Sequence, residues 1–242
     1  MSLTLERALY QKSHRYFLAF FACMAAAFWF TYFTRLFQQE TWRQHAHGIA
    51  LILWCLMLVG QPMLIRAKQY VWHRRVGRCS YLLVPVLFLT TLGLLKYRLS
   101  KSRPLTAADF AFVALVVNAL VAFGILYGFA IYWRKRPVIH ARFMVATAFP
   151  MFTPITDRIL FIYFPSLVPY LPLIEGQPNA PVVGFLMADA MLVGLSLWDW
   201  ISHKRWNVFP FALVVLLAYH WSFLYGYQFA AWQRFCTWFA AL

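Results

Sequence analysis

The stretch FMVATAFPMFTPITDRILFIYF, residues 143–164, determines the class of this protein. Apart from the adjacent pair Asp157 and Arg158 it holds no charged residue. It is long enough to cross a bilayer as a helix, because about 20 apolar residues span roughly 30 Å of hydrocarbon. Ionisable side chains at membrane depth are costly and usually face a bundle interior or a water-filled cavity. The stretch therefore predicts a transmembrane helix that carries part of a functional site.

The composition of the whole chain places this helix among several others. With 63% hydrophobic and 12% charged residues over 242 positions, the sequence excludes a soluble domain and predicts a polytopic membrane protein. No internal repeat or long linker divides it, so we expect one all-α bundle domain over residues 1–242 with seven transmembrane helices. The six other apolar runs are Tyr16–Thr34, His47–Ile65, Cys79–Leu95, Phe110–Trp133, Val182–Trp198 and Val208–Gln233.

The distribution of Lys and Arg predicts the orientation of the bundle. Of 22 such residues, 14 fall on the side of the amino terminus and seven on the other side, with Arg158 inside a span. The amino terminus should therefore be cytoplasmic and the carboxyl terminus outside. The net charge of +15 is scattered over short loops and helix ends. Anionic lipid headgroups on the cytoplasmic side are the expected partners, and nucleic acid is not.

Depth along the predicted helices brings distant residues to one level. At about 1.5 Å per residue, Asp157, Asp189 and His220 fall at nearly the same depth in the outer half of the membrane. Asp157, Arg158 and Asp189 are the candidate catalytic residues, and Arg158 is expected to reach Asp189. The same layer is also compatible with a plain network of salt bridges and hydrogen bonds, or with a proton or ligand site.

A zinc hydrolase acting on a lipid is one hypothesis for this layer, and a small apolar or lipid-like ligand is a further expected partner of the protein. His45 and His47 open the second span, and their spacing places them on different faces of a regular helix. Histidine and aspartate together suit zinc, and a site with an open position activates water. The candidate metal ligands are His45, His47, Asp157, Asp189 and His220.

The sequence leaves two other hypotheses open. One is a b-type cytochrome, because histidines on facing transmembrane helices hold heme. His47 and His220 would ligate on the outer side, while His73 and His140, expected in loops close to the membrane, would do so on the cytoplasmic side. The other is a non-enzymatic ligand binder, transporter or assembly factor that holds no cofactor.

Two resemblances accompany these hypotheses. The motifs His47-Gly48, Gln61-Pro62, His73-Arg74, Gly77-Arg78 and His140-Ala141-Arg142 resemble a group of uncharacterised bacterial multi-pass membrane proteins, over the second to fifth spans. This resemblance implies a location in the bacterial cytoplasmic membrane and no particular activity. The count of seven spans with buried His and Asp is weakly similar to seven-helix zinc hydrolases of the ceramidase and progestin-receptor type. Their complete pattern of Ser, His-x-x-x-His and Asp is not present.

Overall fold

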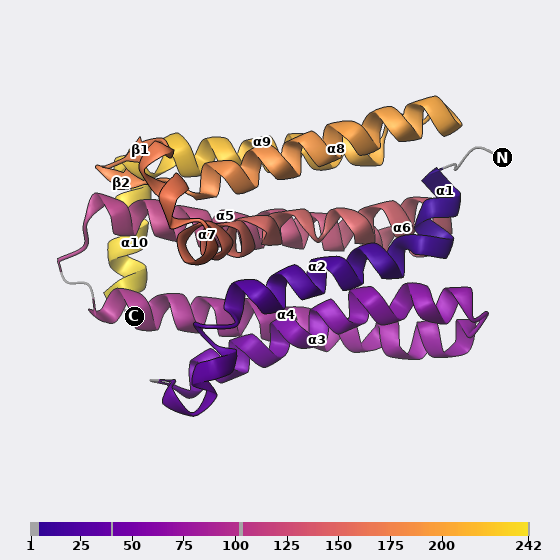
Figure 1. The fold of residues 1–242 in the computed structure, drawn as a ribbon, viewed down its shortest axis with the longest axis horizontal. Coiled ribbons are helices and arrows are strands. Elements are labelled where there is room, and N and C mark those ends of the chain that lie inside the picture. The colour runs from indigo at the N-terminus through magenta and orange to yellow at the C-terminus, as the bar shows by residue number, and fades with distance from the viewer. Residues whose placement is uncertain (1–4, 40, 102–103, 242) are drawn as a thin grey trace. The chain divides into compact units, whose positions relative to one another are not determined.

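The computed structural model describes residues 5–39, 41–101 and 104–241, most of which are helical (Figure 1). Contacts along the chain divide it into two compact units, Met1–Leu94 and Leu95–Leu242. The prediction of a single domain stays a prediction. The helices are α1 (Leu5–Arg7), α2 (Ser13–Phe28), α3 (Trp42–Arg66), α4 (Tyr70–Lys101), α5 (Ala107–Tyr132), α6 (Pro137–Ala146), α7 (Phe152–Tyr163), α8 (Pro181–His203), α9 (Val208–Tyr225) and α10 (Ala230–Ala241).

Short turns of other helix types and one small hairpin complete the fold. A π-helical turn, Ala8–Lys12, joins α1 to α2, and 3₁₀ turns cover Phe33–Gln38, Phe149–Met151, Pro165–Tyr170 and Gly226–Gln228. Strands β1 (Leu173–Ile174) and β2 (Gln177–Pro178) pair antiparallel. Their two-residue turn, Glu175 and Gly176, has positive φ at both positions (50° and 72°), as hairpin turns of type I′ require. Tyr227 donates a hydrogen bond of 2.9 Å to Glu175 and so fastens the hairpin to the end of α9.

The predicted class, an all-α protein with helices suited to a membrane, is confirmed. Six helical segments in the described chain are long and apolar enough to cross a bilayer: Trp42–Arg66, Tyr70–Lys101, Ala107–Tyr132, Pro137–Tyr163, Pro181–His203 and Val208–Gln228. The predicted first span, Tyr16–Thr34, overlaps α2, which ends at Phe28 and has only 16 residues. A seventh span and the orientation of the termini therefore stay predictions.

Two predicted helix starts are wrong, and both errors move histidines from loops into helices. In the first unit, α4 begins at Tyr70 and not at Cys79, so His73 is helical. In the second unit, the span predicted from Phe143 begins at Pro137, which occupies the first turn of α6, so His140 is helical as well. Lys and Arg are good helix formers, and proline is favoured at the first helical position. A basic segment therefore extends α4, whereas α6 starts at Pro137, directly after the basic residues 134–136.

The second unit packs α7 against α8, α8 against α9, and α5 against both α6 and α9. A 3₁₀ turn at Phe149–Met151 separates α6 from α7, with Pro150 in the turn and Pro154 just after it. Each proline lacks the N–H that would continue an α-helix. The break places Thr153, Thr156 and Asp157 on a separate short helix that faces α8.

The predicted end of the last span at Gln233 is also wrong. Helix α9 ends at Tyr225, and after a 3₁₀ turn the chain enters α10, which runs across the direction of α5 (Figure 1). Trp232 donates a hydrogen bond of 3.1 Å to the carbonyl of Phe110. Cys236 is fully buried in a cluster with Leu99 and Val113. These contacts hold α10 across one end of the second unit.

We expect a reporter fused after the last residue to be active outside the cytoplasm. With a cytoplasmic amino terminus, this result requires α2 to cross the membrane as a seventh span, as the distribution of Lys and Arg predicts. A pair of reporters that are active on opposite sides of the membrane provides the measurement, and a fusion within the turn between α5 and α6 provides the cytoplasmic control. A carboxyl-terminal reporter active only in the cytoplasm would contradict the predicted topology.

Candidate functional site

The centre of the candidate site is a histidine and carboxylate pair on α9 and α8. Nδ1 of His220 lies 3.2 Å from Oδ2 of Asp189, so these two predicted site residues do come together. The imidazole is 6% exposed and stacks on the ring of Phe185, with 3.9 Å between ring centroids. A histidine held by a carboxylate at one nitrogen and by an aromatic face has a fixed ring orientation.

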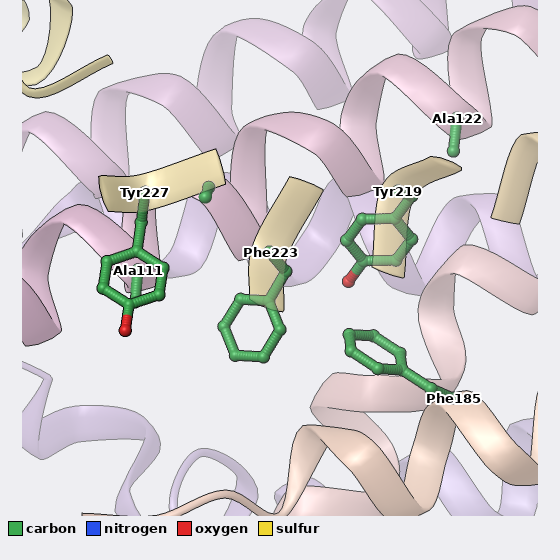
Figure 2. Packing of buried hydrophobic residues seen from close by; sticks show 7 residues of the cluster. Ala111, Ala122, Phe185, Tyr219, Phe223 and Tyr227 are labelled. Atoms are coloured by element: carbon green, nitrogen blue, oxygen red, sulfur yellow. The ribbon is translucent and has the colours of Figure 1, made fainter. Parts of the chain in front are cut away.

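A second polar contact links α9 to α7. The hydroxyls of Tyr219 and Thr153, both buried, lie 3.3 Å apart. Figure 2 shows Phe185 close to Tyr219 and Phe223 within the same buried cluster. Gly184 permits the close approach of α8 to α7, because a Cβ atom at this position would lie 2.5 Å from Oγ1 of Thr156.

Asp157 lies on the same face of α7 as Thr153, because residues four apart are neighbours on a helix. Its Oδ1 atom is buried and has no hydrogen-bond partner among the described residues, and the same holds for Oδ1 of Asp189. Each buried acceptor without a donor costs about 1–3 kcal/mol. We refer to Thr153, Asp157, Asp189, Tyr219 and His220 together as the polar layer.

Arg158 extends along its own helix. Its Nη1 donates a hydrogen bond of 2.9 Å to the carbonyl of Pro154, one turn earlier. The ion pair predicted between Arg158 and Asp189 stays a prediction, whereas the contact between Asp189 and His220 is established in the structure. Asp157 and Arg158 are adjacent in sequence and so point about 100° apart around α7.

The remaining predicted metal ligands belong to the first unit. His45 contacts the Tyr32 hydroxyl at 3.3 Å, and His47 contacts the Thr91 hydroxyl at 3.2 Å. The two imidazoles therefore serve different neighbours, as their spacing on a helix predicts. Within the described residues, no three His, Cys, Asp or Glu side chains gather closely enough to hold a metal ion. A zinc site stays a prediction.

The two histidines predicted for a cytoplasmic heme also lie in different units. His140 donates from Nδ1 to the carbonyl of Ala130 at 2.7 Å, which ties α6 to the end of α5. His73 lies on α4 beside Gln61. With the amide nitrogen of Gln61 facing His73, this nitrogen donates to Nδ1 and to the carbonyl oxygen of His73. Heme ligation by either residue stays a prediction.

Sequence reasoning missed the best-formed charged contact in the second unit. Arg142 donates from Nε and Nη2 to the two carboxylate oxygens of Asp199, at 2.6 and 2.7 Å, and from Nη1 to the carbonyl of Val138 at 2.9 Å. The side chains of Arg142 and Asp199 are 0% and 3% exposed. Nδ1 of His203 lies 3.3 Å from Asp199, an ion-pair distance without hydrogen-bond geometry.

The signal for this pair was present in the sequence. A span that begins at Phe143 leaves Arg142 in the preceding loop, where a cation needs no buried partner. Once α6 begins at Pro137, Arg142 lies in its second turn and needs a buried partner. Asp199, one residue beyond the predicted end of its span, is the carboxylate at the matching end of α8.

Comparisons of the chain with protein-family models, with curated proteins and with solved structures found no match. The functional interpretation therefore rests on the geometry of the polar layer and of the surfaces around it.

Proposed function

We propose that this protein binds and releases protons at the polar layer, as a transporter or ligand binder of the membrane and not as an enzyme. Six helices in the described chain are long and apolar enough to cross a bilayer. The bacterial cytoplasmic membrane is the proposed location of the protein. The observation that carries the proposal is the pair of buried carboxylate oxygens, Oδ1 of Asp157 and Oδ1 of Asp189, that lack a donor.

The chemistry of the layer favours a proton at these atoms. A buried carboxylate without a donor becomes less costly when it is protonated, because the charge disappears and a hydrogen-bond donor is gained. Nδ1 of His220 lies 3.2 Å from Oδ2 of Asp189, so a proton bound at the layer can be shared between these two side chains. The ring of Phe185 covers one face of the His220 imidazole. The side chain of His220 is 7% exposed and that of Asp189 is 21% exposed.

Infrared difference spectra recorded between about pH 5 and pH 8 test the proposal. We expect acidification of the purified protein to produce a carboxylic acid band that weakens in Asp157→Asn and in Asp189→Asn. Glu175→Gln is the matched control, since this exposed carboxylate lies on the hairpin and accepts a hydrogen bond from Tyr227. A band that the two aspartate variants leave unchanged would contradict the proposal.

A zinc site at His220 is the second candidate, supported by one specific observation. Histidines that bind metals with one ring nitrogen usually donate from the other to a carboxylate, and Nδ1 of His220 contacts Asp189 in this way. Nε2 would then bind the ion, Asp189 would orient the ring, and zinc would supply activated water for lipid hydrolysis. Elemental analysis decides this candidate, with zinc expected in the native chain and lost in His220→Gln.

The cytochrome hypothesis is tested on the same preparation. A heme held by His73, His140, His47 or His220 gives the purified protein an intense visible absorption. Each single histidine variant would then shift or abolish that absorption, and a colourless native protein would contradict the hypothesis.

A further inference from the structure

A basic cavity lies in the first unit, where the segment before α2 meets the turn between α3 and α4. Its volume is about 550 Å³. Four of its lining residues are the cations Lys12, Arg15, Arg66 and Lys68. Among the described residues that line the cavity, none is acidic. Four like charges around one cavity repel each other, so an anion that enters it relieves the repulsion.

Arg66 contacts a histidine at this cavity, and this contact brings no negative charge to the guanidinium. Its Nη1 lies 3.2 Å from Nε2 of His14. A guanidinium has no acceptor, so Nε2 must accept this hydrogen bond and the imidazole must be neutral. The contact orients Arg66 and leaves its positive charge available.

Lys68 reaches the cavity from an unusual backbone position. It follows the end of α3 with φ of 56°, in the left-handed region where helices usually place glycine. Its N–H donates to Ile65 at 3.0 Å, and the N–H of Gln69 donates to Leu64 at 2.8 Å, which closes the helix end. A lysine here gives up the conformational freedom of glycine and gains a cation at the cavity.

We propose that this cavity binds the phosphate headgroup of an anionic phospholipid. Two candidate spans, Trp42–Arg66 and Tyr70–Lys101, have their ends at the cavity, and the ends of a membrane span lie near lipid headgroups. Exposed aromatic side chains at Tyr16 and Trp72 flank the same level, as in the aromatic belts of membrane proteins. Arginine and lysine in such pockets bind lipid phosphates. A free phosphate anion shares this chemistry but does not account for the position at the ends of the spans.

Native mass spectrometry of the full-length chain in detergent measures the binding directly. The protein is titrated with phosphatidylglycerol, with zwitterionic phosphatidylcholine, and with inorganic phosphate as the soluble probe. We expect phosphatidylglycerol to bind at least tenfold more tightly than phosphatidylcholine. Arg15→Gln combined with Arg66→Gln should weaken it by about tenfold or more, since each cation near a membrane surface contributes a factor of roughly five.

The matched control removes the same charge elsewhere on the unit. Arg74→Gln combined with Arg78→Gln changes two exposed cations on α4 outside the cavity, and the affinity should stay within about twofold. Lys68→Gly separates binding from folding, because it removes a cation and relieves the left-handed backbone. It should weaken binding without lowering the unfolding temperature. Equal losses in both double variants, or saturable binding of inorganic phosphate without lipid selectivity, would overturn the proposal.

Discussion

Replacing Asp199 with leucine should lower the free energy of unfolding by about 3–5 kcal/mol, the largest effect of a single substitution that we expect in the second unit. The change leaves the guanidinium of Arg142, which is 0% exposed, without the two hydrogen bonds of 2.6 and 2.7 Å that hold it. The hydrogen bond from Nη1 to the carbonyl of Val138 does not balance the charge. Thermal unfolding in detergent measures this loss of stability, with the fraction of protein that stays monodisperse as the readout.

Arg142→Leu should be less damaging than Asp199→Leu. Asp199 keeps the imidazole of His203 at 3.3 Å, so its carboxylate retains a polar neighbour when Arg142 is removed. The double variant should recover part of the loss, because leucines at both positions leave no charge unpaired. Arg134→Leu, at an exposed position before α6, is the control and should change stability by less than about 0.5 kcal/mol. Losses that simply add in the double variant would show that the two residues do not compensate each other.

Apolar length predicted the helical class and the positions of the six candidate spans. Apolar length did not predict the helix ends, because hydropathy shows where charged residues begin and not where helical hydrogen bonding stops. The helix that begins at Tyr70 continues through basic residues whose side chains can reach away from the apolar core while their backbone stays helical. The helix that begins at Pro137 continues through Arg142, whose charge is balanced by Asp199. At Tyr225 the reverse happened, since apolar residues continue beyond the end of the helix into α10.

The same limit explains what was and was not predictable about the site. Depth arithmetic was sufficient for Asp189 and His220, because their depths are counted from helix starts that were predicted to within one residue. It could not pair Arg142 with Asp199, because both lay at boundaries placed wrongly by a few residues. The direction of each side chain around its helix also needs the packing of neighbours. The contacts of His45 with Tyr32 and of His47 with Thr91 come from that packing.

Gly184→Ala should lower the free energy of unfolding by about 1–3 kcal/mol, the usual range for a residue inserted into a filled core. A Cβ atom at this position would lie 2.5 Å from Oγ1 of Thr156 and 3.0 Å from Cα of Thr153, which is backbone and cannot rotate away. Helix α8 must therefore move away from α7. Gly194→Ala on the same helix is the matched control, because nothing lies within 4 Å of its added Cβ. It should be neutral or stabilising by up to about 1 kcal/mol, since alanine is the better helix former.

The effect of Gly184→Ala should also reach the polar layer, because α8 carries Asp189 and α7 carries Asp157. If α8 moves, the pH at which the carboxylic acid band appears should shift, while Gly194→Ala leaves it unchanged. Adding Thr156→Ala removes the nearest obstacle but keeps the contact at 3.0 Å with Thr153, so stability should return only in part. Equal stability and an equal infrared titration in both glycine variants would show that the close approach of α7 and α8 does not position the two aspartates.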